Sequence, residues 1–190
     1  MKRNVNRKFL QILFSIAVFL VFVIGFNSIV YGQIQYSHHF TKKLEACGVE
    51  FIRPLEGYYK VKMKRRDRFI NYDLVLYSED YNFEMRFWLD PDYRHDVPHI
   101  TAFSLVNSLA INEPHFDIHM NLFREEDAKA YFNANWAAYS DFIPKRSLSD
   151  KHFGRLVCIY HQDKGMIYNL MLFNDHVEEK DRRLYALQFQ

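Results

Sequence analysis

The chain has 190 residues, of which 25 are basic and 23 acidic, so its formal net charge is +2. The first 32 residues contain four of the basic residues and none of the acidic ones, which leaves a formal charge of −2 on the other 158 residues. Because that remainder is not basic, we expect no nucleic-acid partner. Its length suits a single hydrophobic core.

The N-terminus has the pattern of an export signal. Four basic residues within the first eight precede an apolar run over residues 9–26. Val30 and Gly32 then place small side chains three and one residues ahead of Gln33, as signal peptidase requires. We therefore predict cleavage between Gly32 and Gln33.

Two interpretations of this N-terminal segment remain open, a cleaved signal peptide and an uncleaved membrane anchor. With cleavage, residues 1–32 are a signal peptide and residues 33–190 form a single exported domain, periplasmic or extracellular. Without cleavage, the apolar run would be a helix about 27 Å long, close to the roughly 30 Å hydrocarbon core of a bilayer, and would anchor the domain. We expect membrane contact only through this segment.

The first half of the domain is predicted to contain a short helix followed by antiparallel strands. A helix over residues 37–46 ends at Gly48, and residues 49–52 form the first strand. Three strands of a meander follow, with a two-residue alternation of side chains, over residues 59–64, 71–77 and 83–89.

Two helices are predicted in the middle of the chain, separated by a strand over residues 115–122. The first begins at Pro98, and its apolar residues recur every three positions, at Ile100, Phe103, Val106 and Leu109. The second begins near residue 124, where acidic residues suit the positive end of the helix dipole, and it ends at Pro144. Its buried residues are predicted to be Ala128, Phe132, Trp136 and Tyr139.

The last third contains the clearest local pattern. Residues 155–162 and 166–173 are apolar strands joined by a turn in which Gly165 supplies a positive φ. Residues 184–189 are predicted to return as a final strand. The predicted fold class is α+β, with an antiparallel sheet of about six or seven strands and helices packed on it as a layered sandwich.

A short leading strand ends at Phe51-Ile52-Arg53-Pro54, and two amphipathic strands, a helix, a strand, a second helix and the hairpin over residues 156–173 follow. In this order of elements, residues 49–189 resemble the PsbP-like α/β/α sandwich family. The resemblance implies an exported accessory or binding protein rather than an enzyme. It matches no motif and assigns no site residue.

One cluster could bind a metal ion. Strand alternation would place His115, Asp117 and His119 on one face, and these side chains are typical zinc ligands. Residues two apart on a strand lie about 6.6 Å apart and residues four apart about 13 Å, so one ion can bind Asp117 with only one of the histidines. A metal-binding protein or metal-dependent hydrolase is therefore one hypothesis, and the solvated face of an amphipathic strand is the other.

Basic residues are concentrated between positions 60 and 68. On a domain of negative net charge, this local patch suits contact with lipid headgroups, acidic glycans or an acidic protein face. The alternative is a solvated strand face whose lysines discourage edge pairing. Trp88 shares a strand face with Glu84 and Arg86, where it is either a contact residue or covered by a helix. The candidate binding patch is Lys60, Lys62, Lys64, Arg65, Arg66, Arg68 and Trp88.

The chain contains two cysteines, Cys47 and Cys158. An oxidising compartment would allow a disulfide between them. The alternative is two buried thiols, because Cys158 lies within an apolar run. Both remain open.

No catalytic motif is present. The glycines of the domain are isolated, and the sequence has no Gly-x-Ser-x-Gly, His-Glu-x-x-His or Cys-x-x-Cys motif. We therefore expect an exported, non-enzymatic binding or accessory protein with an unknown protein partner and no cofactor. A periplasmic immunity protein is a narrower alternative, suggested by small size, predicted export and the lack of catalytic chemistry.

Overall fold

The computed structural model describes residues 34–52, 55–62, 70–111, 118–175 and 178–190. They belong to one compact unit that begins at Ile34. The predicted signal peptide and the Gly32–Gln33 cleavage site lie outside the described residues. Within the described ranges, no helix is both long and apolar enough to cross a membrane.

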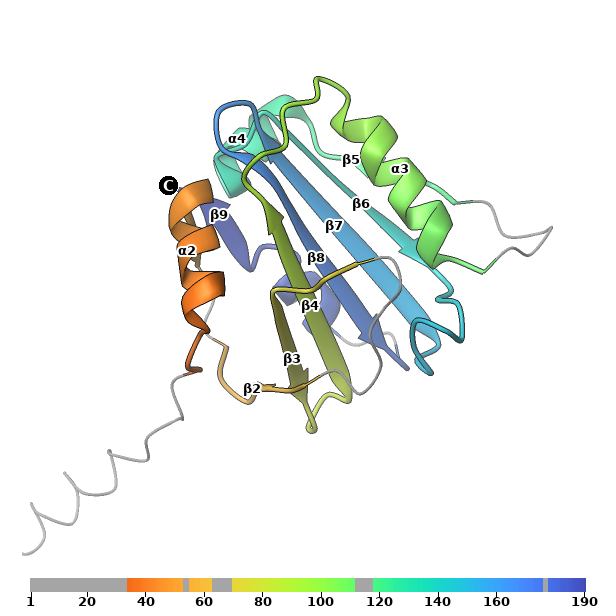
Figure 1. Cartoon of the computed structure of the whole chain (residues 1–190). Coiled ribbons are helices and arrows are strands. Elements are labelled where there is room, and N and C mark those ends of the chain that lie inside the picture. Colours follow the sequence, from red (N-terminus) through yellow and green to blue (C-terminus); the bar gives the residue numbers. More distant parts are fainter. Residues whose placement is uncertain (1–33, 53–54, 63–69, 112–117, 176–177) are drawn as a thin grey trace, which may run out of the picture. The chain divides into compact units, whose positions relative to one another are not determined.

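Seven antiparallel strands form the main sheet, in the order β2-β3-β4-β8-β7-β6-β5 (Figure 1). Strands β1 and β9 form a separate two-stranded antiparallel sheet. These pairings confirm the predicted α+β class. The strand bounds are Val49–Phe51 (β1), Tyr59–Lys60 (β2), Leu74–Ser78 (β3), Phe83–Asp90 (β4), Asn121–Leu122 (β5), Trp136–Phe142 (β6), Phe153–His161 (β7), Gly165–Phe173 (β8) and Leu187–Phe189 (β9).

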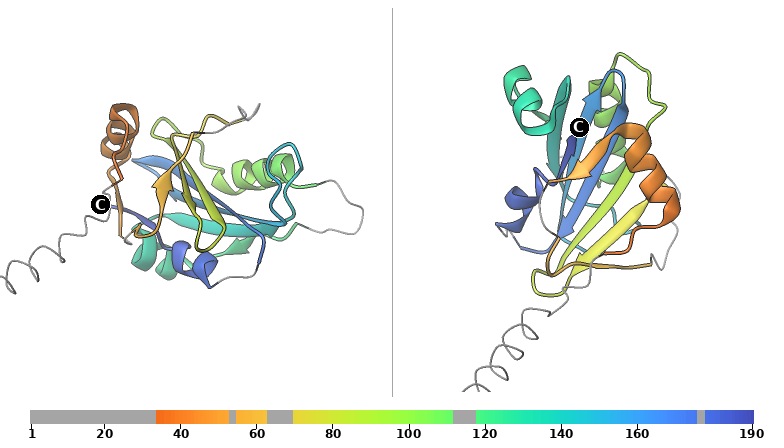
Figure 2. Two further views of the ribbon diagram at one scale, coloured as in Figure 1. Left: turned by 90° about the horizontal axis from the view of Figure 1, so that it is seen from below. Right: turned by 90° about the vertical axis from the view of Figure 1, so that its left-hand side faces the viewer.

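Helices cover both faces of the main sheet. Helix α3 (Pro98–Leu109) lies on one face, whereas α4 (Glu125–Phe132) and the short α5 (Glu179–Arg183) lie on the other (Figure 2). Helix α2 (His38–Cys47) packs against β4 through Phe40, within the same core as α4. As predicted, α2 ends at Gly48, whose φ of 57° is left-handed.

The sheet separates two hydrophobic cores. One contains Phe83 and Phe87 of β4 with Phe132 of α4, and the other contains Leu170 of β8 with Val106 of α3. All nine residues of β8 are buried, which explains why β7 and β8 appear in the sequence as continuous apolar runs. The predicted turn between them is also present. Gly165 has a φ of 99°, and a Cβ there would overlap the carbonyl oxygen of Asp90.

The predicted buried face of α3 is only half right. Val106 and Leu109 are buried, but Ile100 and Phe103 are 55% and 49% exposed, and Ala102 faces the sheet instead. Three residues fall about 60° short of one helical turn, so a repeat of three drifts around the helix. Three such steps carry Ile100 to the side opposite Leu109.

The predicted second helix is wrong beyond Phe132. Asn133 adopts a left-handed φ of 49° and ends α4, and Trp136–Phe142 is β6. Trp136 and Tyr139 therefore lie on opposite faces of a strand rather than on one helical face. Pairing with β7 along the whole of β6 overrides the helical spacing of these residues.

Further elements differ from the prediction, among them the final strand, which covers only Leu187–Phe189 of the predicted residues 184–189. Strand β2 covers only Tyr59–Lys60, and residues 63 and 64 of that predicted strand lie outside the described residues. In the predicted strand over residues 115–122, only β5 is formed among the residues described. Helix α5 falls in a polar segment for which no element was predicted.

Both cysteines are buried free thiols. Cys47 belongs to the core on the α4 side of the sheet and Cys158 to the core on the α3 side, so the sheet lies between them and the disulfide hypothesis is wrong. Burial is the main cause that raises the pKa of Cys47, to about 12, and burial also raises the pKa of Cys158.

We expect neither thiol of the native protein to react with Ellman's reagent at pH 8. The raised pKa of each thiol lowers the fraction of thiolate, and burial keeps the reagent away from the sulfur. After unfolding in guanidinium chloride without reductant, both cysteines should react. Fast labelling of the native chain, or no labelling of the unfolded chain, would contradict two buried free thiols.

Buried charges fix α5 to the rest of the domain. Glu179 is 2% exposed and accepts hydrogen bonds from the hydroxyl of Tyr58, at 2.9 Å, and from Nε of Arg183, at 2.5 Å. The guanidinium of Arg183 also lies 4.8 Å from the centre of the Tyr58 ring. Removing the carboxylate would take away the negative charge that Glu179 places beside this buried cation.

Glu179→Ala should therefore lower the free energy of unfolding by about 3–5 kcal/mol, as for other broken buried ion pairs. Glu178→Ala is the matched control, because Glu178 is exposed and should change stability by less than about 0.5 kcal/mol. Urea unfolding followed by circular dichroism measures both. Equal stability of the two variants would show that α5 does not depend on this network.

Candidate functional site

Strand β4 presents a second set of side chains to the α3 side of the sheet. Trp88 lies directly opposite Tyr168 of β8, and their rings stack with centroids 4.5 Å apart and planes 7° apart. Tyr72 meets Trp88 edge-on, at 5.5 Å and 76°. Trp88 is thus half-buried, with its orientation fixed by two rings.

Arg86 lies beside these rings and is only 5% exposed. Its Nε donates to Glu84 at 2.5 Å, its Nη2 donates to the carbonyl of Leu148 at 3.2 Å, and its guanidinium lies 5.2 Å from the centre of the Tyr72 ring. Nη1 is buried and has no hydrogen-bond partner among the described residues. Burial opposes the charge, but Glu84 and Tyr72 outweigh it and raise the pKa of Arg86, so the guanidinium stays protonated.

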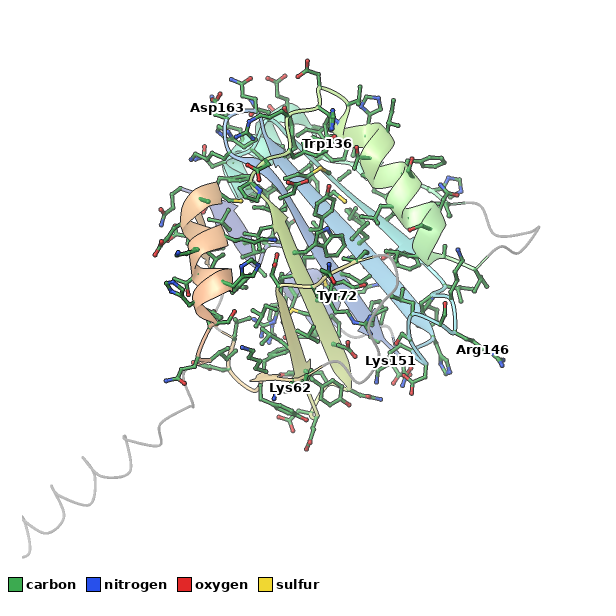
Figure 3. All side chains as sticks on the ribbon, in the orientation of Figure 1. Lys62, Tyr72, Trp136, Arg146, Lys151 and Asp163 are labelled. Atoms are coloured by element: carbon green, nitrogen blue, oxygen red, sulfur yellow. The ribbon has the colours of Figure 1, made fainter. Side chains whose placement is uncertain are left out.

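The same face continues to the β3–β4 turn. Tyr59 is opposite Tyr77, which is in turn opposite Glu84, so both tyrosines share the face of Arg86. Their ring centroids are 5.9 Å apart, and Nζ of Lys151 lies 5.5 Å from the centre of the Tyr77 ring. We call this set the aromatic–basic surface: Tyr59, Tyr72, Tyr77, Arg86, Trp88 and Lys151. Figure 3 labels Tyr72 and Lys151 on it.

The candidate binding patch is only partly described. Lys60 and Lys62 are exposed, whereas Lys64, Arg65, Arg66 and Arg68 lie outside the described residues. Lys60 is opposite Leu76, a residue of the core on the α4 side, so Lys60 does not share the face of Tyr59. The structure therefore groups Trp88 with Arg86 and Tyr72 rather than with Lys60.

The metal hypothesis also falls partly outside the described residues, because His115 and Asp117 are not among them. His119 is exposed, and its backbone carbonyl accepts a hydrogen bond of 2.8 Å from Ser140. In the described ranges, no three His, Cys, Asp or Glu residues are placed to hold one ion. The site at His115, Asp117 and His119 remains a prediction.

Comparison with solved structures finds two similar chains. Over 83% of this chain and 92% of that chain, the protein is similar to the solution structure of cyanobacterial PsbP (CyanoP) from Synechocystis sp. PCC 6803, with 14% sequence identity and a TM-score of 0.39. This is the family that the order of predicted elements resembles. No family model matches the sequence, and no curated protein matches it. No residue role is carried over from the similar structure.

Sequence reasoning singled out Trp88 but not the residues that hold it. Tyr168 could have been proposed as a partner, because it occupies an alternating position of the predicted hairpin. Its place opposite Trp88 depends on the pairing of β4 with β8, which are separated by more than seventy residues of sequence. Nothing in the neighbouring sequence indicates that Arg86 contacts Leu148 or that Lys151 contacts Tyr77.

Arg86→Met should lower the free energy of unfolding by about 1.5–3 kcal/mol, because Glu84 and the carbonyl of Leu148 lose a charged donor. Arg146→Met is the control, since Arg146 is exposed. Urea unfolding curves of both variants measure the difference. An effect of Arg86→Met no larger than that of the control would contradict a structural role for this arginine.

Proposed function

We propose that this chain is an exported, non-enzymatic binding or accessory protein, and that it contacts a protein partner through the aromatic–basic surface. The observation that carries the proposal is the grouping of four aromatic rings with two cations on one sheet face. Tyrosine, tryptophan and arginine are the side chains most enriched at the centres of protein interfaces.

The rings are held in place before any partner arrives. Trp88 is fixed by Tyr168 and Tyr72, and the hydroxyl of Tyr77 donates to Asn82 at 2.8 Å. Tyr59, which is 44% exposed, donates from its hydroxyl to Glu79 at 2.9 Å. Fixed side chains lose little conformational entropy on binding, which favours affinity.

The predicted cleavage site lies next to the start of the compact unit. Ile34 and Tyr36 pack against the core, and the stacked rings of Tyr36 and Phe51 are 5.6 Å apart. The fold thus starts one residue after Gln33, the predicted first residue after cleavage. A cleaved signal peptide would therefore remove no residue of the described domain.

The proposal predicts that the double variant Tyr59→Ser/Tyr77→Ser recovers at most about a tenth of the partner that the wild type recovers, because most binding energy comes from a few aromatic side chains. The measurement is cross-linking in the host's envelope fraction, followed by affinity capture and mass spectrometry. Leu122→Ser is the control, since Leu122 is 64% exposed but lies on β5, at the opposite edge of the sheet from β2.

Recovery of the same protein in equal amounts by the wild type and the double variant would exclude this surface. Failure of the wild type to enrich any protein, together with turnover of a substrate, would exclude the binding function itself.

A further inference from the structure

A second aromatic cluster lies on the opposite face of the sheet, where α4 and the segment after α5 approach β6 (Figure 2). Its rings come from four elements that are distant in sequence. Tyr131 belongs to α4, Tyr139 to β6, Tyr185 to the turn after α5, and Phe123 to the link between β5 and α4. The aromatic–basic surface contains none of them.

Two of these rings form an open wedge at the surface. The centroids of Tyr131 and Tyr185 are 4.9 Å apart and their planes are tilted by 53°. Phe132 supports Tyr185 from below, at 5.6 Å and 21°, and Phe123 lies 6.3 Å from Tyr185. Tyr131 is 47% exposed and Tyr185 is half-buried, so the wedge is reachable from solvent.

Carboxylates surround this wedge. Asp127 lies four residues before Tyr131 in α4, on the same side of the helix. Burial is the largest cause that raises the pKa of Tyr185, and the neighbouring groups Tyr131, Tyr139, Asp127 and Asp181 raise it further. Of these causes, the negative charges of Asp127 and Asp181 favour a positive charge beside Tyr185.

Part of the same cluster already holds a cation from this chain. The guanidinium of Arg155 lies 4.5 Å from the centre of the Tyr139 ring. It donates to Asp141 at 2.6 and 2.7 Å and to Asp181 at 2.8 Å. A tyrosine face flanked by carboxylates is thus the arrangement that binds an arginine within this fold.

Tyr131, Tyr185 and Asp127 provide the same kinds of group, tyrosine rings and a carboxylate, without a cation. Among the described residues, no lysine or arginine lies over the ring of Tyr131 or Tyr185. Their hydroxyls also make no hydrogen bond to any described residue. The ring of Tyr131, which contacts only that of Tyr185 among the described aromatic pairs, and both hydroxyl oxygens are therefore available to a ligand.

We propose that Tyr131, Tyr185 and Asp127 bind an arginine side chain of a partner protein. A cation within about 6 Å of a tyrosine centroid is attracted by the ring, and a planar guanidinium stacks better than an ammonium group. Asp127 adds the counter-charge. This site would give the chain a second contact, independent of the aromatic–basic surface.

The test is isothermal titration of the full-length chain, in neutral detergent, with the amidated peptide Gly-Arg-Gly-Arg-Gly. The control peptide has citrulline, which keeps the planar shape but carries no charge, in place of arginine. We expect saturable binding of the arginine peptide with a Kd of about 1 mM or lower, and at least tenfold weaker binding of the citrulline peptide.

Two variants locate the binding. Asp127→Asn and Tyr131→Leu should each lower the affinity for the arginine peptide at least fivefold. Asp127→Asn removes the counter-charge, and Tyr131→Leu removes an aromatic ring. Tyr81→Leu changes a tyrosine at the β3–β4 turn that is 40% exposed, and it should leave the Kd unchanged. Circular dichroism spectra identical to the wild type show that each variant is folded.

Equal affinity for the arginine and citrulline peptides, or wild-type affinity in both Asp127→Asn and Tyr131→Leu, would overturn the proposal. Absence of binding at about 10 mM peptide would do the same. The variant Tyr59→Ser/Tyr77→Ser should keep full affinity for the peptide, so this test stays separate from that of the aromatic–basic surface.

Discussion

The structure depends on a sheet that is buried on both faces. Strand β8 has no exposed residue, and β7 is exposed only in part at its two ends. Side chains therefore enter a core in both directions from each central strand, and both faces need a covering layer. Helix α3 supplies that layer on one side, and α2, α4 and the β1–β9 pair supply it on the other.

This constraint also explains how the charged side chains are arranged. Arg86, Arg155 and Arg183 are each at most 5% exposed. Each one pairs with a carboxylate and lies over a tyrosine ring. A buried guanidinium costs several kcal/mol unless such contacts compensate it, so each arginine needs its pair where a covering layer buries it. The carboxylates and tyrosines concerned are Glu84 and Tyr72, Asp141 and Tyr139, and Glu179 and Tyr58.

Two of these arginines also stabilise the proposed contact surfaces. Arg86 connects β4 to the carbonyl of Leu148, and Lys151 of the same loop reaches Tyr77, so the loop between β6 and β7 supports the aromatic–basic surface. On the opposite face, Arg155 joins β6, β7 and α5 beneath the tyrosine wedge. Both surfaces consist of rings whose positions are fixed from within the domain, as high-affinity contacts require.

Local elements could be predicted from the sequence alone. The sequence predicted the end of α2 at Gly48, the alternation of β4, the start of α3 at Pro98 and the Gly165 turn of the β7–β8 hairpin, because each depends on a few neighbouring residues. It also identified Trp88 as a contact candidate.

The places where these elements meet follow from the three-dimensional fold. It ended α4 at Asn133 and made β6 a strand, because pairing with β7 outweighs local propensity. It placed Cys47 and Cys158 on opposite sides of the sheet, and it brought Tyr168 under Trp88 and Tyr185 beside Tyr131. Such contacts depend on strand register and on helix packing between distant segments, and neither is encoded in the spacing of adjacent residues.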